Sequence, residues 1–70
     1  MMPLTMVNPG EEFTVQKVGG LDDTKRFLNN LGFTEGAKVT VVSKISENLI
    51  VNVRDSRVAL DADLAKKIMV

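Results

Sequence analysis

Apolar and polar residues alternate with a period of two around Phe13 and Val15, and this alternation ends at Gly19-Gly20. Because successive side chains of a strand point to opposite faces, the pattern predicts a short β-strand with one face on a core. The residues before the turn at Pro9-Gly10 are mostly apolar. We expect them to form an edge segment laid across the domain.

The period changes after the glycine pair, because Phe27, Leu28 and Leu31 lie on one stripe of a short helix. We expect Asp22 or Asp23 to be the N-cap of this helix. A carboxylate at that position accepts a hydrogen bond from a free backbone N–H group, and its charge suits the helix N-terminus. The stripe predicts that Phe27 lies in the core with the two leucines.

The stretch after the helix predicts two sharp changes of chain direction. If the helix ends at Leu31, Gly32 takes a left-handed conformation in which a Cβ atom would be costly. Phe33 then contacts Leu28, the apolar contact that accompanies a Schellman cap. Gly36 closes a second tight turn into the next strand. Both glycines therefore have a structural explanation.

The second half of the chain predicts short strands joined by tight turns. Val42 and Ile45 break the alternation of the first of these strands, which predicts a bend or a β-bulge. Polar residues at 46–48 and at Asp55-Ser56 predict turns, and Asp61 is placed to cap one helical turn. The expected elements are strands over residues 37–45, 49–54, 57–60 and 68–70 and a helical turn over residues 62–67.

These elements predict one mainly-β domain over residues 1–70, a small antiparallel β-barrel of about five strands. It carries a short inserted α-helix and a C-terminal helical turn. No apolar run approaches the roughly 18 to 20 residues that cross a bilayer, and the first residues lack the features of a signal peptide. We therefore expect a cytoplasmic protein without direct membrane insertion.

Composition argues against several classes of function. Nine basic residues balance nine acidic ones, so no net positive field attracts nucleic acid. The chain has no cysteine and no histidine, which removes thiol chemistry and the commonest general base. Phe13, Phe27 and Phe33 are the only aromatic residues, and we expect all three in the core. We predict neither an enzyme with catalytic residues nor a nucleic-acid-binding protein.

Three acidic pairs are the candidate ligands for a hard cation: Glu11-Glu12, Asp22-Asp23, and Asp61 with Asp63. None has the length or the glycine of a calcium loop, and two of them have expected roles at helix ends. We assign no metal ligand and no cofactor, and weak binding of a hard cation by surface carboxylates stays open.

In combination, these features resemble the FeoA family, over about Leu4 to Val70. The matching segments are, in chain order, Leu4 and Pro9-Gly10, residues 25–33 (KRFLNNLGF), residues 34–39 (TEGAKV), and residues 57–60 (RVAL) followed by Ala65 and Ile68. The chain departs from the family pattern at Glu47–Leu49, at Asp55-Ser56 and at Asp61. We expect the fold to tolerate these departures, whereas the partner surface around the third and fourth strands can differ.

The resemblance implies an SH3-like barrel and a small cytosolic accessory protein of ferrous iron uptake, not an enzyme. The implied partner is the membrane ferrous iron transporter or its cytosolic GTPase domain. The alternative is a metal-binding regulatory domain that senses a transition metal through surface carboxylates, and weak binding of ferrous iron by such carboxylates stays open. The expected contact residues are polar and lie on the outer helix face and in nearby turns. They are Lys25, Arg26, Asn29, Asn30, Thr34, Glu35, Arg54 and Arg57.

Overall fold

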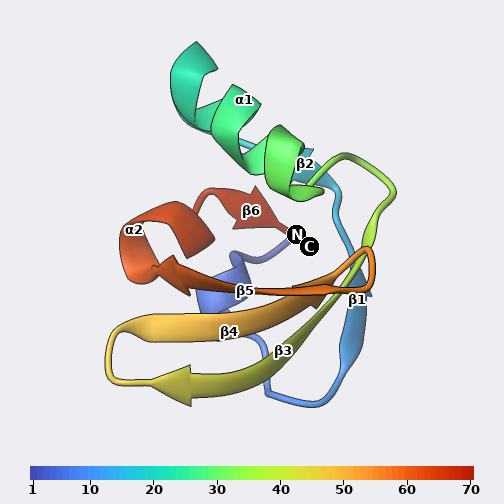
Figure 1. Ribbon diagram of the computed structural model, residues 1–70, viewed down its shortest axis with the longest axis vertical. Coiled ribbons are helices and arrows are strands. Elements are labelled where there is room, and N and C mark those ends of the chain that lie inside the picture. Colours follow the sequence, from blue (N-terminus) through green and yellow to red (C-terminus); the bar gives the residue numbers. More distant parts are fainter.

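Two antiparallel sheets, one of four strands and one of two, surround the core (Figure 1). The computed structural model describes all residues from 1 to 70. Its elements are, in chain order, the 3₁₀ turn η1 (Leu4–Met6), β1 (Glu12–Thr14), β2 (Lys17–Val18), α1 (Asp22–Leu31), β3 (Lys38–Ile45), β4 (Asn48–Val53), β5 (Ser56–Asp61), α2 (Ala62–Ala65) and β6 (Ile68–Met69). The mainly-β class with an inserted helix and a C-terminal helical turn is confirmed.

The segment predicted as one first strand is divided between the two sheets. β1 pairs with β3, whereas β2 pairs with β6. Val15 lies between β1 and β2, is buried, and donates its N–H to the Ala37 carbonyl at 2.8 Å. The structure has six strands instead of about five because the chain bends at this point from one sheet into the other.

The larger sheet has the strand order β1-β3-β4-β5. Leu49, Val51 and Val53 of β4 are buried, as their alternation predicts. The pairing of β3 with β4 shifts between Val41 and Ser43, which confirms the bulge expected near Val42. A bulge increases the local twist and bends the strand, so it helps the sheet to curve around the core.

The turn between β4 and β5 consists of Arg54 and Asp55, not of Asp55 and Ser56 as predicted. Both turn residues have positive φ, 49° and 64°, and Ser56 already pairs with Val53. A two-residue turn with positive φ at both positions matches the twist of the flanking strands. Arg54 and Asp55 do not indicate such a turn in the sequence, because glycine or asparagine usually occupies turn positions with positive φ. Asn48 likewise begins β4 rather than ending the preceding turn.

The predicted aspartate cap of α1 is wrong, although the helix itself is present. Leu21 is the N-cap, its backbone is extended (φ −74°, ψ 163°), and no side chain caps the helix. The Leu21 carbonyl accepts the first helical hydrogen bond, from Lys25 N–H at 2.9 Å. Asp22 and Asp23 lie in the first turn, where negative charge still suits the N-terminal end of the helix dipole.

The predicted apolar stripe of α1 is only partly buried. Leu28 is fully buried and Leu31 half-buried, but Phe27 is 50% exposed. Figure 1 shows why: α1 projects from the body of the molecule and packs against it mainly through its C-terminal end. Phe27 lies about 100° around the helix from Leu28 and falls on the flank. The expectation that all three phenylalanines lie in the core is therefore wrong for Phe27.

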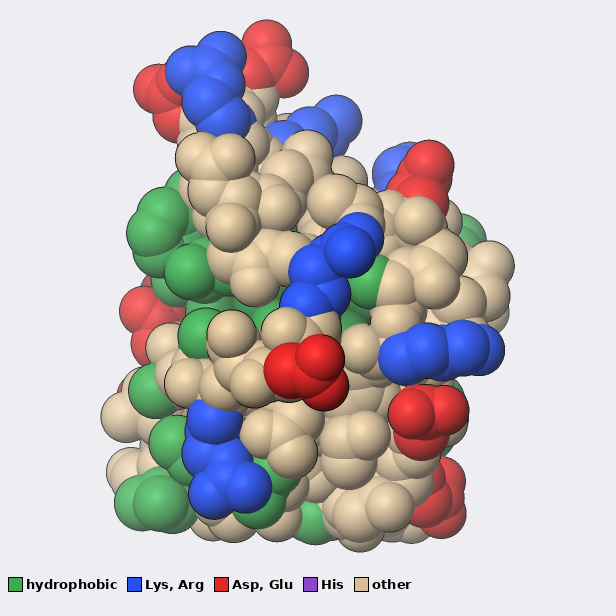
Figure 2. Space-filling view, turned by 45° about the vertical axis from the view of Figure 1, so that its right-hand side comes forward, with side chains coloured by type: hydrophobic (Ala, Val, Ile, Leu, Met, Phe, Trp, Pro, Cys, Tyr) green, Lys and Arg blue, Asp and Glu red, His purple; other side chains and the backbone are tan.

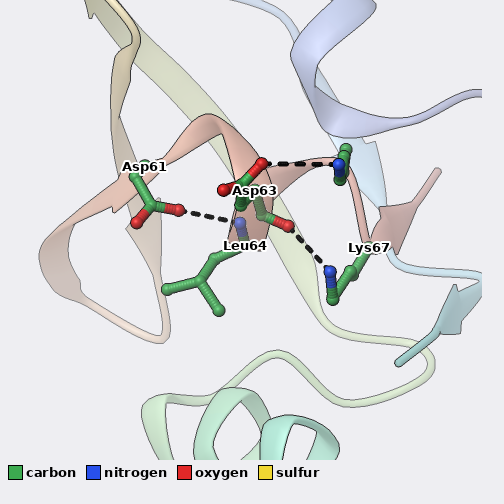
Figure 3. Close-up of polar contacts among 5 residues, drawn as sticks. Asp61, Asp63, Leu64 and Lys67 are labelled. Carbon is green, nitrogen blue, oxygen red and sulfur yellow. Dashed lines mark hydrogen bonds and ion pairs between the residues drawn. The ribbon is translucent and has the colours of Figure 1, made fainter. Parts of the chain in front are cut away.

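The C-terminal helical turn is present with its predicted cap, but it ends at Ala65 instead of at Lys67. Asp61 Oδ1 accepts a hydrogen bond from Leu64 N–H at 2.9 Å and caps α2, as Figure 3 shows. Ala65 of α2 is fully buried. The chain then returns through β6 to the N-terminus, where Met2 and Val70 exchange both backbone hydrogen bonds, at 2.9 and 2.8 Å.

The segment before the Pro9-Gly10 turn contributes two side chains to the core. Leu4 and Val7 are buried, whereas Met2 and Met6 are exposed, and Pro3 forms a β-bridge with Met69. The core consists of Leu4, Val7, Val15, Leu28, Phe33, Ala37, Val39, Val41, Leu49, Val51, Val53, Leu60, Ala65 and Ile68. None of the helices has the length and apolar character that a membrane-spanning segment needs.

Candidate functional site

The segment Phe27–Gly36, which we call the joint, connects α1 to the barrel and has the predicted Schellman geometry. Gly32 has φ 113°, and its N–H donates to the Asn29 carbonyl at 3.0 Å. Phe33 N–H donates to the Leu28 carbonyl at 3.0 Å, and both side chains are fully buried. The helix therefore ends at a fixed point and the chain enters the core there.

The second turn of the joint is also present. Ala37 N–H donates to the Thr34 carbonyl at 3.0 Å, and Gly36 has φ 88°. Gly36 N–H donates to the Val15 carbonyl at 2.8 Å, which ties the turn to the segment between β1 and β2. Backbone hydrogen bonds thus hold both ends of the joint, so its exposed side chains extend from a backbone of defined conformation.

Arg54 links the joint to the turn between β4 and β5. Its Nε donates to the Gly32 carbonyl at 3.3 Å, and its Nη2 donates to Thr34 Oγ1 at 2.8 Å. A Cβ atom on Gly32 would come within 3.0 Å of Arg54 Cδ. Gly32 is therefore needed both for its positive φ and for the close approach of this arginine.

Two shallow hollows border the joint. The larger, of about 810 Å³, is bounded by Glu35 of the joint and by Arg54 and Arg57 of the neighbouring hairpin. The smaller, of about 190 Å³, is lined by Lys25, Asn29, Thr34 and Glu35, with Val18. Glu35 is the residue that the two hollows share. The lining of both is mostly polar, which suits a wet protein contact better than an apolar ligand.

Most of the sequence-predicted contact residues are thus brought together around the joint. Arg26 and Asn30 are exceptions, since they line neither hollow. Both are exposed on α1, and Arg26 Nη1 lies 3.6 Å from Asp23 Oδ1 in a largely exposed ion pair that contributes little stability. Arg57 donates from Nε to Asn52 Oδ1 at 3.1 Å. Figure 2 shows that charges of both signs mingle on this face, with no patch of a single sign.

The sequence analysis missed the apolar part of this surface. Phe27 is 50% exposed and Leu21 is 82% exposed, and both belong to α1 or its N-cap. Leu21 is at the N-terminal end of α1, which projects from the barrel in Figure 1, and no local pattern in the sequence indicates how much of the helix the barrel covers. An exposed aromatic residue on a projecting helix is typical of protein contacts.

The three acidic pairs stay apart in the structure. Nowhere do three acidic, histidine or cysteine side chains gather closely enough to hold a metal ion. Asp61 uses one carboxylate oxygen to cap α2, and Asp63 lies 3.4 Å from Lys66 Nζ.

Comparisons with known proteins agree with each other. The sequence model of the FeoA domain matches residues 2–70. A Methanocaldococcus jannaschii protein that carries the provisional name Fe(2+) transport protein A is 31% identical over 70 residues, which is 100% of this chain and 85% of the relative.

Two solved structures resemble the chain closely. Stenotrophomonas maltophilia FeoA, solved with zinc, is described as a prokaryotic SH3 domain protein and suggested to be a ferrous iron transport activating factor. It shows 32% identity and a TM-score of 0.87, with 99% of this chain and 88% of that chain covered. An iron uptake regulatory protein (FeoA) shows 28% identity and a TM-score of 0.88, with 96% and 91% covered. The SH3-like barrel expected from the sequence is thereby confirmed.

Proposed function

Since this chain belongs to the FeoA family, we propose that it is an accessory protein of ferrous iron uptake that acts by contact with the transporter's cytosolic GTPase domain. The observation that carries this proposal is the family match, which spans residues 2–70. The name of the Methanocaldococcus jannaschii relative and the suggested role of Stenotrophomonas maltophilia FeoA support the link to iron transport.

The chemistry of the surface favours contact over catalysis. The chain has no histidine or cysteine, and its hollows are shallow and polar. A protein without a catalytic group can still change the activity of a partner by stabilising one of the partner's conformations. We therefore assign the protein no catalytic residue. Contact with a cytosolic GTPase domain also implies that the protein acts in the cytoplasm, on the same side of the membrane as that domain.

The proposed contact surface is the exposed side of α1 together with the joint and the neighbouring segment Arg54–Arg57. It contains the half-exposed Phe27, which is available as an aromatic anchor, and polar residues around it. Aromatic and arginine side chains supply most of the binding energy at typical protein interfaces. The polar residues proposed for the contact are Lys25, Arg26, Asn29, Asn30, Thr34, Glu35, Arg54 and Arg57.

A binding titration with the isolated GTPase domain tests this proposal. We expect Phe27→Ala to weaken binding at least about tenfold, the usual effect of truncating an aromatic anchor. Ile45→Ala is the matched control, because Ile45 is a similarly exposed apolar residue (60%). It ends β3, and the end of that strand lies far from α1 in Figure 1. Equal affinities for both variants and the unaltered protein would contradict the proposed surface.

Metal sensing is the second candidate, favoured by the zinc complex of Stenotrophomonas maltophilia FeoA. In this chain it would rest on surface carboxylates such as Glu11-Glu12 and Asp61 with Asp63. Titration of the labelled protein with a low-micromolar paramagnetic divalent ion tests it by NMR. Line broadening confined to one acidic pair would support metal sensing, and uniform or absent broadening would contradict it.

A further inference from the structure

The strand β5 is an open edge of the larger sheet. It lies at the end of the strand order and pairs only with β4. In an antiparallel pair, alternate residues direct both backbone groups toward the neighbour. Because Val53 and Ser56 flank the two-residue turn, Arg57 and Ala59 direct their N–H and C=O groups away from β4. No backbone hydrogen bond from another part of the chain reaches these two residues.

Side-chain exposure agrees with an open edge. Arg57 and Ala59, on the outer face of β5, are exposed, whereas Asn52 and Ile50 beside them on β4 are only half-exposed. Val58, on the inner face of β5, is also half-exposed although it packs against the core.

This edge lacks most of the usual protection against strand addition. Exposed edges are commonly blunted by short length, proline, a bulge or charged side chains, and of these β5 carries only the charges of Arg57 and Asp61. β5 has six residues, its pairing is regular, and it contains neither proline nor glycine. At the opposite edge of the same sheet, β1 has only three residues.

We propose that β5 pairs with β5 of a second copy of this chain, antiparallel and with Ala59 opposite Ala59 on the two-fold axis. The Ala59 N–H and C=O groups then bond to those of the second copy's Ala59. In this register Arg57 of each copy lies directly opposite Asp61 of the other. Residues directly opposite on one face have Cβ atoms about 4.5 to 5.5 Å apart, so the unlike charges attract.

Both charged groups have the capacity for this contact. Neither Arg57 nor Asp61 takes part in an ion pair within the chain. Asp61 uses only Oδ1 for its cap, and Arg57 uses only Nε for its bond to Asn52, so the other carboxylate oxygen and the terminal guanidinium nitrogens remain. The register that instead places Arg57 opposite Arg57 is disfavoured by like charges.

Charge complementarity with itself is the reason to assign a second copy rather than an unrelated peptide. A symmetric contact uses the same edge of both molecules, so it closes after two copies. The short β1 edge offers little for a third copy to extend. The dimer leaves α1 and the joint free but covers Arg57, so at that residue dimerisation and the proposed contact with the GTPase domain exclude each other. The inference itself rests on the β5 edge and does not depend on that partner.

Sedimentation velocity of the full chain over a range of concentrations tests the proposal. We expect a reversible monomer–dimer equilibrium that weakens as salt is raised, because the Arg57–Asp61 contacts are exposed to screening. Arg57→Glu places like charges opposite each other twice per dimer, and we expect it to weaken dimerisation about tenfold. Lys17→Glu is the matched control, since it makes the same charge change at an exposed residue of β2, and we expect it to leave dimerisation unchanged.

A second variant tests the backbone contact. Ala59→Pro removes an N–H group that points away from β4, so it spares the ladder within the chain and abolishes the pairing at the two-fold axis. In the unaltered protein, we expect the Ala59 amide to become protected from hydrogen exchange as the concentration rises. A chain that stays monomeric at high concentration with a rapidly exchanging Ala59 amide would overturn the proposal. A dimer that neither Arg57→Glu nor Ala59→Pro weakens would overturn it as well.

Discussion

Arg54 Nη2 lies 2.8 Å from Thr34 Oγ1, and this hydrogen bond joins the turn between β4 and β5 to the joint at the end of α1. The two residues come from segments that are unrelated in sequence. Arg54 Nε also reaches the Gly32 carbonyl, at 3.3 Å. The position of the projecting helix is therefore fixed by the Schellman cap within its own segment and by one arginine from the barrel.

We predict that Gly32→Ala destabilises the protein more than Gly36→Ala does. Both glycines have positive φ, 113° and 88°, so each substitution costs about 1 to 2 kcal/mol in backbone strain. Only Gly32 also lacks room, because a Cβ atom would lie 3.0 Å from Arg54 Cδ, whereas Gly36 has nothing within 4 Å. Denaturant unfolding measures both losses, and equal losses would show that the contact with Arg54 adds nothing.

Arg54→Ala should lower the free energy of unfolding by about 1 kcal/mol, because it removes the two hydrogen bonds to the joint. Arg54→Gly removes the same bonds but suits the positive φ of 49° at this position. We expect the glycine variant to be more stable than the alanine variant by about 1 kcal/mol. If the alanine variant is the more stable of the two in thermal or denaturant unfolding, the turn does not carry the backbone strain inferred here.

Truncation of the neighbouring α1 residues Leu28 and Phe27 should lower the stability by very different amounts. Leu28→Ala empties a fully buried site and should cost about 2 to 5 kcal/mol. Such a loss is a large part of the stability of a 70-residue domain. Phe27→Ala should cost less than about 1 kcal/mol because half of its side chain is already in water. Unfolding curves of the two variants check this, and a large loss for Phe27→Ala would place Phe27 in the core after all.

Asp61→Ala should cost about 1 kcal/mol through loss of the α2 cap, whereas Asp61→Asn keeps an oxygen that accepts from Leu64 N–H. Denaturant unfolding of the two variants separates the contribution of the cap hydrogen bond to stability from that of the negative charge. Near-equal stability of Asp61→Ala and the unaltered protein would show that the cap is dispensable.

Local patterns predicted most of the fold. The Schellman cap at Gly32, the bulge near Val42 and the cap at Asp61 each depend on a few adjacent residues, and all three are confirmed. The failures depend on distant context. The exposure of Phe27 follows from how little of α1 the small barrel covers, and the kink at Val15 follows from pairing with two different sheets.

In the candidate site, too, features that depend on adjacent residues were predicted and features that depend on distant residues were not. The sequence indicated the water-facing residues of α1, and these are exposed as expected: Lys25, Arg26, Asn29 and Asn30. It did not indicate that Arg54 is bonded to the joint, because no local pattern connects residues 20 positions apart. The roles of the proposed contact residues in partner binding stay predictions.

Contact with the transporter's GTPase domain is the proposed mode of action of this chain, and an amide-shift titration of the labelled protein with that domain tests it most directly. We predict saturable shifts confined to α1, the joint and the Arg54–Arg57 segment, with no change at the distant β3–β4 turn. The absence of any shift at a large excess of the GTPase domain, or shifts confined to the β3–β4 turn, would contradict the account.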